Sequence, residues 1–375
     1  MIDSKTICTR CIMDSSVPNI TFDDHGVCNY CREYLQQCSH VLDDNDGQKE
    51  VRLRSLVARV KKAGKGKPYD CIVGVSGGVD SSWVLVRVIE LGLRPLAVHM
   101  DNGWNSELAQ HNIASLVQRL GVDLHTHVID WHEYRRLMQS FFDADVLDVE
   151  LLYDNAMLAV NYREAAKYGI HFILAGTNSA TEGMRMPDGW NWLKFDKKNI
   201  KAIASKFGNM RLSTFPAIGT LDFFRFRFIN RIRWTSILDL MPYNKASVLG
   251  ELQEKYGYKP YPYKHYESIF TRFYQGYILP TKFGVDKRKL HLSTLVASGQ
   301  MGRAQALADL ERIPYPSQGQ LTEDRQYFLK KMNWTEADLQ AYLARPEVAH
   351  DAYGSERPLW DFCGRTLKRL RRLRT

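Results

Sequence analysis

The chain has 375 residues, of which 45% are hydrophobic and 25% are charged, and it contains 25 glycines and 13 prolines. This composition excludes a disordered, collagen-like or low-complexity protein, and the length is typical of two or three domains. No apolar stretch approaches the roughly 18 residues of a membrane span, and the first residues lack the apolar core of a signal peptide. We therefore expect a cytoplasmic protein.

The formal net charge is +9, and it is concentrated at one end of the chain. Six basic side chains and no acidic ones lie in residues 365–375, which leaves a net charge of about +3 elsewhere. A confined basic tail does not require nucleic acid, and we expect none as a partner. Leu367, Leu370 and Leu373 recur among these cations at helical spacing, which predicts a basic amphipathic helix; we expect a solvated or partner-binding tail, with contact to an anionic membrane surface as the alternative.

Two Cys-x2-Cys pairs, Cys8 with Cys11 and Cys28 with Cys31, stand near the start of the chain. In a reducing compartment such pairs are typical of metal ligands rather than disulfides. Four thiolates suit tetrahedral zinc and leave no open position for a substrate. We predict a structural zinc knuckle that stabilises a segment too short to have its own core, with a four-thiolate iron–sulfur cluster as the alternative.

After the knuckle, the polar stretch 39–48 is typical of a linker, and helical spacing follows over 50–62. Apolar strands and amphipathic helices then alternate. The expected strands are 69–75, 95–100, 124–129 and 171–175, and the expected helices are 81–91, 106–120 and 151–168. Alternation of this kind predicts an α/β fold with a parallel, doubly wound sheet.

Beyond about residue 190 the alternation ends, and the rest is predicted to be mainly helical, with proline-rich breaks at 258–263 and 313–316. Three parts are therefore expected. They are a zinc knuckle with its linker (1–48), an α/β domain (49–235), and a helical region for substrate or partner binding that ends in the basic tail (236–375).

A glycine- and serine-rich turn lies between the first expected strand and its helix. It comprises Ser76, Gly77, Gly78, Val79, Asp80, Ser81 and Ser82. Backbone N–H groups at a helix N-terminus attract a phosphate, glycines let the backbone approach it closely, and serine hydroxyls add hydrogen bonds. Neither the Walker pattern G-x4-G-K-[ST] nor a G-x-G-x-x-G turn occurs in the chain, so we predict a phosphate-binding loop of another class.

This turn resembles the fingerprint S-G-G-x-D-S-[ST] of the PP-loop ATP pyrophosphatases at every fixed position. The resemblance implies an adenine nucleotide alpha hydrolase-like fold, cleavage of ATP between its alpha and beta phosphates, and transfer of AMP to a substrate oxygen. It also implies that the second strand holds adenine near Val98 and Met100.

A further segment, 176–182, resembles the G-T-x4-E segment of ammonia-dependent NAD synthetase. That likeness implies that Gly176 and Thr177 contact the nucleotide, and that Asp80 and Glu182 hold Mg²⁺. Carboxylate oxygens are suitable ligands for Mg²⁺, which neutralises the charge of departing pyrophosphate.

Downstream, a polar and aromatic segment begins at Lys264 and includes an expected helix from residue 265. Its cations, with those that follow, suit the phosphates of a nucleotide-linked substrate, because Arg and Lys bind such groups. They are Lys264, Arg272, Lys282, Lys287 and Arg288.

The combination T-x-C-x-x-C-x-M, S-G-G-V-D-S-S, K-H-Y-E-S and K-F-G-V-D-K-R-K-L-H-L-S resembles the N-acetyl sugar amidotransferases of bacterial surface-polysaccharide biosynthesis, in the LPS O-antigen and nonulosonic acid pathways. The resemblance implies that ATP and ammonia convert the N-acetyl group of a nucleotide sugar to an acetamidino group. It implies ammonia from separate glutaminase and channel subunits that resemble the two halves of imidazole glycerol phosphate synthase.

We expect the acetamido oxygen to be adenylylated and AMP to be displaced by ammonia, with His265 or Glu267 as the base. The expected catalytic set is Asp80, Lys264, His265, Glu267, Arg272, Lys287 and Arg288. The alternative is a PP-loop enzyme that adenylates a tRNA base before sulfur or nitrogen transfer. The confined charge disfavours it, as does the absence of a Cys-x-x-Cys pair among Cys38, Cys71 and Cys363.

Overall fold

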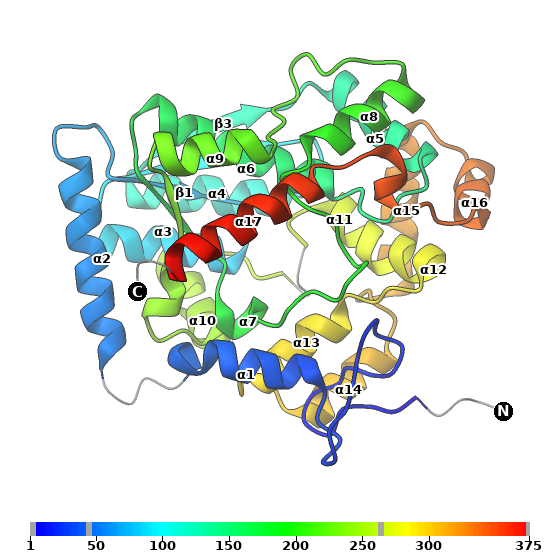
Figure 1. Cartoon of the computed structure of the whole chain (residues 1–375), viewed down its shortest axis with the longest axis horizontal. Coiled ribbons are helices and arrows are strands. Elements are labelled where there is room, and N and C mark those ends of the chain that lie inside the picture. The colour runs from blue at the N-terminus through cyan, green and yellow to red at the C-terminus, as the bar shows by residue number, and fades with distance from the viewer. Residues whose placement is uncertain (1–4, 43–46, 262–265, 373–375) are drawn as a thin grey trace.

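The computed structural model describes residues 5–42, 47–261 and 266–372, and its centre is a parallel five-stranded sheet (Figure 1). The strands are β1 (Cys71–Gly74), β2 (Pro95–Asp101), β3 (Asp123–Val128), β4 (Phe172–Ala175) and β5 (Arg233–Ser236). Their order is β3-β2-β1-β4-β5, and every neighbouring pair is parallel. The prediction of a doubly wound α/β fold is confirmed.

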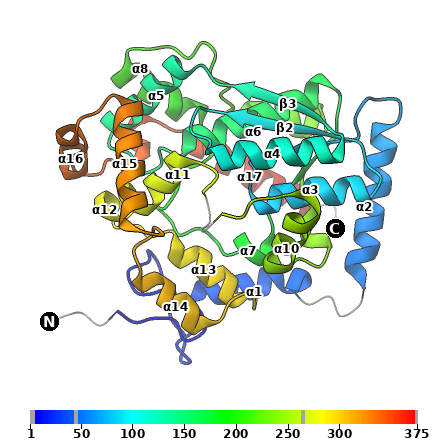
Figure 2. The ribbon, with the colours of Figure 1, turned by 180° about the vertical axis from the view of Figure 1, so that it is seen from behind.

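The helices before the C-terminal region are α1 (Asn29–Leu42), α2 (Gln48–Gly64), α3 (Val79–Glu90), α4 (Glu107–Leu120), α5 (Trp131–Asp143), α6 (Leu151–Lys167), α7 (Ser179–Glu182), α8 (Lys197–Gly208) and α9 (Thr220–Phe224). Alternate residues of β1 belong to different cores on the two faces of the sheet. Cys71 and Val73 pack with α2, α3 and α4, whereas Ile72 packs with α5 and α6 (Figure 2). Burial on both faces explains why the central strands are continuous apolar runs.

The C-terminal region is mainly helical, as expected. Its helices are α10 (Lys245–Tyr256), α11 (Ile269–Phe273), α12 (Leu279–Phe283), α13 (Arg288–Ala297), α14 (Arg303–Glu311), α15 (Gln318–Met332), α16 (Glu336–Ala344) and α17 (Arg357–Arg372). Short π-helical segments, η1 (Arg225–Ile229) and η3 (Tyr274–Ile278), continue α9 and α11. The domain boundaries at residues 48 and 235 stay a prediction. None of the helices in the described ranges combines the length and apolar character needed to cross a bilayer.

Two sequence expectations for single elements were wrong, and one strand was missed. The expected linker 39–48 is partly helical, since α1 continues to Leu42 and α2 begins at Gln48. The helix expected from residue 265 begins at Ile269, because the Ser268 hydroxyl caps it by accepting a hydrogen bond from the Thr271 N–H at 3.2 Å. Strand β5 was not expected, because the short edge sequence Arg-Trp-Thr-Ser has no apolar run.

Phe142 at the end of α5 joins the sheet domain to the C-terminal helices. Its ring is fully buried and meets the rings of Phe270, Phe328, Trp334 and Tyr342 at centroid distances of 5.1 to 6.4 Å. One side chain therefore contributes to the packing of α11, α15 and α16 against α5.

We predict that Phe142→Ala lowers the free energy of unfolding by about 3–5 kcal/mol, because it removes a buried ring and leaves a cavity. Val51→Ala, at an exposed position of α2, is the control and should change it by less than about 0.5 kcal/mol. Denaturant unfolding followed by circular dichroism measures both. Equal stability of the two variants would contradict this role for Phe142.

Candidate active site and metal centre

The glycine- and serine-rich turn joins β1 to α3 at the carboxyl end of the sheet. Hydrogen bonds among its own groups shape it: the Ser76 and Ser81 hydroxyls lie 3.2 Å apart, and Ser81 Oγ donates to the Gly78 carbonyl at 3.1 Å. Gly78 precedes the first residue of α3, so the free N–H groups of that helix point toward this turn. The turn has the geometry of a phosphate cradle.

Gly77 is the residue that fixes the path of this turn. Its φ is +83°, and a Cβ atom there would lie 2.8 Å from the Ala109 carbonyl oxygen of α4. The hydroxyls of Tyr258 and Tyr261 both donate to the Gly77 carbonyl at 3.0 Å. Because the carbonyl and the following N–H of a peptide point in opposite directions, this pair of bonds sets the direction of the Gly78 N–H.

Two acidic side chains, Asp80 of α3 and Glu182 of α7, act on the Tyr243 hydroxyl. The Tyr243 hydroxyl donates to the Asp80 carboxylate. Burial, then the charge of Asp80 and then that of Glu182, raise the pKa of Tyr243. Both residues expected to hold Mg²⁺ thus act on the same tyrosine from segments about 100 residues apart in the sequence, and their binding of Mg²⁺ stays a prediction.

The segment after β4 reaches this acid pair because Gly176 has no side chain. A Cβ atom on Gly176 would lie 2.8 Å from the Ser81 backbone nitrogen, so the two backbones are in direct contact. Thr177 follows, and its hydroxyl lies 2.8 Å from that of Ser236. Asn178 then caps α7 by accepting a hydrogen bond from the Thr181 N–H at 2.9 Å. Glu182 is the last residue of this short helix.

Val98 and Met100 are buried in β2, one on each side of His99. The Val98 carbonyl accepts a hydrogen bond from the Val75 N–H at 2.8 Å, so Val98 faces β1 in the ladder. Main-chain groups alternate in direction along a parallel strand, so those of Met100 point to the same side. They lie beyond Gly74, where β1 ends, next to the phosphate turn.

His99 connects the turn to the segment after β2. Its Nδ1 lies 2.8 Å from the Val75 carbonyl, and its Nε2 lies 3.0 Å from the Asn105 amide nitrogen. Because a carbonyl only accepts, Nδ1 carries the proton and Nε2 accepts from Asn105. Burial lowers the pKa of His99, which favours this neutral form.

Glu267 enters the site from the C-terminal region. A Cβ atom on Gly78 would lie 3.7 Å from Glu267 Oε1, which places this carboxylate beside the phosphate turn. Backbone bonds hold the segment: Ser106 N–H donates to the Glu267 carbonyl, and Ile269 N–H donates to the Trp104 carbonyl, both at 2.9 Å. Lys264 and His265, which were also expected to act here, lie outside the described residues.

The expected phosphate-binding cations are engaged inside the protein. Arg272 pairs with Asp324 and lies over the Tyr266 ring, 4.3 Å from its centroid. Lys287 Nζ lies 2.8 Å from a carboxylate oxygen of Glu150. These contacts give Arg272 and Lys287 a demonstrated structural role, whereas their expected contact with substrate stays a prediction.

Arg288 and Lys282 are held even more completely. Arg288 pairs with Asp286 at 2.7 Å and donates to the carbonyls of Asp309 and Arg312. The Lys282 side chain has no exposed surface and pairs with Asp145. These donors are used in packing, which weighs against a direct contact with phosphate.

Lys194 and two carboxylates form a cluster of charged groups that the sequence analysis missed; we name it the Lys194 cluster. Lys194 Nζ lies 2.7 Å from Asp148 Oδ2 and 2.8 Å from Asp154 Oδ2. Asp154 keeps 35% of its side chain exposed, yet burial by surrounding protein raises its pKa. Burial, then the charge of Glu267 and then that of Asp154, raise the pKa of Tyr153.

No spacing rule could have found these residues or the tyrosines that hold the turn. Asp148, Asp154 and Lys194 belong to separate segments. Tyr243, Tyr258 and Tyr261 lie in proline-containing stretches that are typical of loops.

The four cysteines of the predicted knuckle form one buried cluster. Sγ of Cys8 lies 3.9 Å from that of Cys31, Sγ of Cys11 lies 3.8 Å from that of Cys28, and all four lie within 4.8 Å of one another. A tetrahedral zinc–thiolate site places its sulfurs about 3.8 Å apart. Hydrogen bonds with Cys11, then with Cys28 and Cys31, lower the pKa of Cys8. The cluster therefore fits zinc.

The knuckle is attached to the helices that surround the site. Arg303 of α14 donates to the carbonyls of Cys8 and Cys11 at 2.9 Å. The Tyr34 hydroxyl of α1 donates to the Ser179 carbonyl of α7 at 3.0 Å, and its ring leaves no space for a Cβ atom on Gly183. The cysteine cluster thus supports the helix that carries Glu182.

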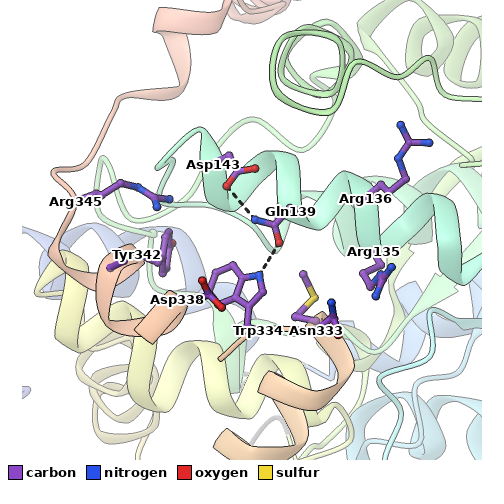
Figure 3. Close-up of a pocket in the computed structure, with 11 residues that line it drawn as sticks. Arg135, Arg136, Gln139, Asp143, Asn333, Trp334, Asp338, Tyr342 and Arg345 are labelled. Carbon is purple, nitrogen blue, oxygen red and sulfur yellow. Dashed lines mark hydrogen bonds between the residues drawn. The ribbon is translucent and has the colours of Figure 1, made fainter. Parts of the chain in front are cut away.

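A separate polar pocket of about 430 Å³ lies between α5 and the helices α15 and α16 (Figure 3). Trp334 donates through its indole nitrogen to Gln139, and Gln139 donates to Asp143. None of the expected site residues lines this pocket.

Comparison with known proteins connects the C-terminal helices to a family. Residues 267–368 match the family model described as "LPS biosynthesis protein WbpG-like, C-terminal domain". The chain carries a WbpG-like C-terminal domain. Glu267, Arg272, Lys287 and Arg288 lie within this WbpG-like domain, whereas the phosphate turn and the cysteine cluster lie before it. No curated protein matches the chain significantly.

Two solved structures show a weak likeness at 14% sequence identity. NMN synthetase from Francisella tularensis gives a TM-score of 0.30 over 57% of this chain and 98% of its own. A predicted subunit of tRNA methyltransferase from Methanocaldococcus jannaschii gives 0.29 over 49% of this chain and 74% of its own. The roles of the site residues are therefore argued from the contacts of this chain alone.

We predict that Gly77→Ala weakens ATP binding at least about tenfold, since the added methyl group meets the Ala109 carbonyl and displaces the turn. Gly66→Ala is a matched control, because Gly66 has a similar φ of +77° and open space around it. Isothermal titration with ATP and Mg²⁺ measures both. Unchanged affinity in Gly77→Ala would remove the turn from nucleotide binding.

We predict about one zinc ion per chain by metal analysis. Cys11→Ser should lower the zinc content and the thermal stability, because the knuckle loses a ligand. Cys38→Ala removes a buried cysteine of α1 outside the cluster and should keep the zinc. A stably folded chain without metal would contradict the structural role, and iron in place of zinc would support the cluster alternative.

Proposed function

We propose that the protein is an ATP-dependent, AMP-forming amidotransferase that converts the N-acetyl group of a nucleotide sugar to an acetamidino group, in LPS or related surface-glycan biosynthesis. The observation that carries the proposal is that Glu267 of the WbpG-like domain lies beside Gly78 of the phosphate turn, two residues before Asp80. The phosphate turn with Asp80 suits ATP, whereas Glu267 comes from a domain typical of LPS biosynthesis.

The phosphate turn would hold the triphosphate of ATP through the N–H groups at the start of α3 and the serine hydroxyls. Adenine would lie against the main chain of Met100, beyond the end of β1. Ser81 and Gly176, whose backbones are in direct contact, would each contact the phosphates. Val98 would contribute a buried wall below the base.

Asp80 and Glu182 would hold Mg²⁺, and Tyr243 would orient Asp80 through its hydroxyl. When bound, the ion would neutralise the charge of the pyrophosphate that leaves. The two carboxylates come from α3 and α7, so the cation site forms only when these helices are correctly placed.

An acetamide requires activation, because its nitrogen donates into the carbonyl and its oxygen is a poor leaving group. In the proposed reaction the acetamido oxygen attacks the alpha phosphorus of ATP, and the bond to pyrophosphate breaks. Ammonia then adds to the carbon, loses a proton, and AMP departs with the original oxygen. The sum is acetamide, ammonia and ATP giving amidine, AMP and pyrophosphate.

Glu267 is our choice for the base that takes the proton from the attacking nitrogen, because its carboxylate lies beside the phosphate turn. We infer that the sugar lies near Tyr153, Asp154 and Lys194, because the charges of both Glu267 and Asp154 act on Tyr153. Aromatic and charged side chains of this kind bind sugar rings and hydroxyls. The ammonia would come from separate glutaminase and channel subunits.

The product of the reaction tests the chemistry directly. Incubation with ATP, Mg²⁺, ammonium and a panel of diacetamido nucleotide sugars should release AMP and pyrophosphate, with a sugar product about one dalton lighter because NH replaces O. Chromatography and mass spectrometry measure both products. Release of ADP and phosphate would refute adenylylation, and salt-dependent binding and modification of tRNA would favour the alternative.

We predict that Asp80→Asn and Glu182→Gln each lower kcat at least about 100-fold without loss of folded structure, because each removes a charge at the developing pyrophosphate. Glu107→Gln is the matched control, since Glu107 is an exposed acid in the first turn of the next helix, α4. Activity at several Mg²⁺ concentrations measures the effect. Turnover close to wild type in either variant would exclude that residue from the role.

A further inference from the structure

A surface outside the candidate active site combines exposed apolar side chains with cations that form no ion pair among the described residues. It consists of α9 with η1 (Thr220–Ile229), the residues up to Arg233, and α17; we name it the α9–α17 surface (Figure 1). Five of the eleven large apolar residues that are exposed in the described ranges lie on it, from 38% for Leu359 to 76% for Ile229. The others are Leu221, Phe228 and Phe362.

Ring contacts make these elements one continuous surface. The Trp360 ring of α17 stacks on Phe195 at 5.1 Å and meets Phe223 at 5.2 Å. Phe224 contacts Trp360 at 6.2 Å and stacks on Phe228 at 5.7 Å. The stack fixes α17 against α9 and leaves Phe228 half exposed at its outer end.

Helix α17 uses only part of its apolar stripe for this packing. At 100° per residue, Trp360, Cys363 and Leu367 fall on one side of the stripe, and these three are partly buried. Leu359 and Phe362 fall on the other side and are exposed. Packing against the rest of the protein does not account for the exposed apolar side chains of α17, which are typical of a contact surface.

Cations surround the exposed apolar residues. Exposed basic residues of the α9–α17 surface are Arg225, Arg231, Arg233, Arg365, Lys368 and Arg369. In the part of the chain that the structure describes, none of these six forms an ion pair with a carboxylate. Asp361 is the acid on α17, and Asp222 of α9 is already paired with Lys197 at 3.0 Å. The occupant of this surface must therefore be anionic.

A pocket of about 500 Å³ opens beside η1 and has the same character. Arg163, Lys167 and Arg225 line it, together with Asp222 and with Asn230, whose amide oxygen is buried and has no hydrogen-bond partner among the described residues. Lys167 pairs with Glu164 and Asp222 pairs with Lys197, so the two arginines are the donors that this pocket offers to a phosphate that bears hydroxyl groups.

We propose that the α9–α17 surface binds the surface of an anionic lipid bilayer. Phe228, Ile229 and Phe362 enter the boundary between headgroups and acyl chains, and the arginines contact the lipid phosphates. A bilayer interface accepts both kinds of side chain at once. RNA would engage the cations but would leave Leu221, Ile229 and Leu359 in water, so it fits this surface less well.

This orientation leaves the candidate active site accessible. Phe226 of η1 stacks on Tyr162 of α6 at 5.3 Å, so the α9–α17 surface lies outside α6, on one face of the sheet. The phosphate turn lies instead at the carboxyl edge of the same sheet. The protein would bind the membrane by a face of the fold, with the edge open to substrates.

Vesicle sedimentation with the full chain tests the proposal. We expect the partition coefficient for vesicles of equal parts phosphatidylglycerol and phosphatidylcholine to be at least about tenfold higher than for phosphatidylcholine alone, and to fall at high salt. Equal binding to both vesicles, or no binding to the anionic ones, overturns the proposal.

Variants localise the binding. Phe228→Ser with Ile229→Ser and Phe362→Ser should reduce partitioning at least about tenfold through lost apolar burial. The triple variant Arg225→Glu, Arg365→Glu and Arg369→Glu should also reduce partitioning, because it reverses charges that attract the anionic lipids. This charge variant keeps the proposal testable if the apolar variant unfolds. The control is Val51→Ser with Arg52→Glu on α2, where Val51 is equally exposed, and it should change partitioning less than about twofold.

Thermal unfolding shows which variants are folded. Wild-type partitioning in the folded charge variant overturns the proposal. So does loss of a protein or RNA partner by that variant while vesicle binding is unchanged, because the surface would then serve that partner.

Discussion

The site depends on one close backbone contact at the carboxyl edge of the parallel sheet. Gly176, directly after β4, lies so near Asp80 and Ser81 at the start of α3 that no side chain fits between them. Parallel strands bring their carboxyl ends to one edge, and this contact joins two of those ends. It brings the segment that leads to Glu182 against the segment that carries Asp80, and the Tyr243 hydroxyl donates to Asp80. A larger residue at position 176 would separate the acidic pair.

Two peripheral parts of the chain brace this contact from outside. The cysteine knuckle holds α7 through Tyr34 and holds α14 through Arg303. An antiparallel bridge between Asn105 and Ser268 holds the Glu267 segment of the WbpG-like domain beside the turn. A zinc ion far from any substrate would thus influence the cation site, since α7 is only four residues long and cannot hold its own position.

Buried charge distinguishes the interior of this site from its rim. Lys194 between Asp148 and Asp154, and Lys287 beside Glu150, are pairs that burial would make costly if one partner were lost. Such pairs fix the positions of their own side chains more firmly than flexible surface charges would. The cations expected to bind phosphate are thus used in packing, and in the proposed function the turn would supply the donors for ATP.

The sequence by itself determined four of the five strands and the local chemistry of the turn and the knuckle, because strand periodicity, the Ser76–Ser82 pattern and the Cys-x2-Cys spacing all act over a few residues. Only the tertiary structure decided which distant residues share the site. Tyr243, Tyr258, Lys194 and the pairing of Lys287 with Glu150 arise from contacts between segments with no common pattern. Long-range packing sets such contacts, and no local spacing encodes them.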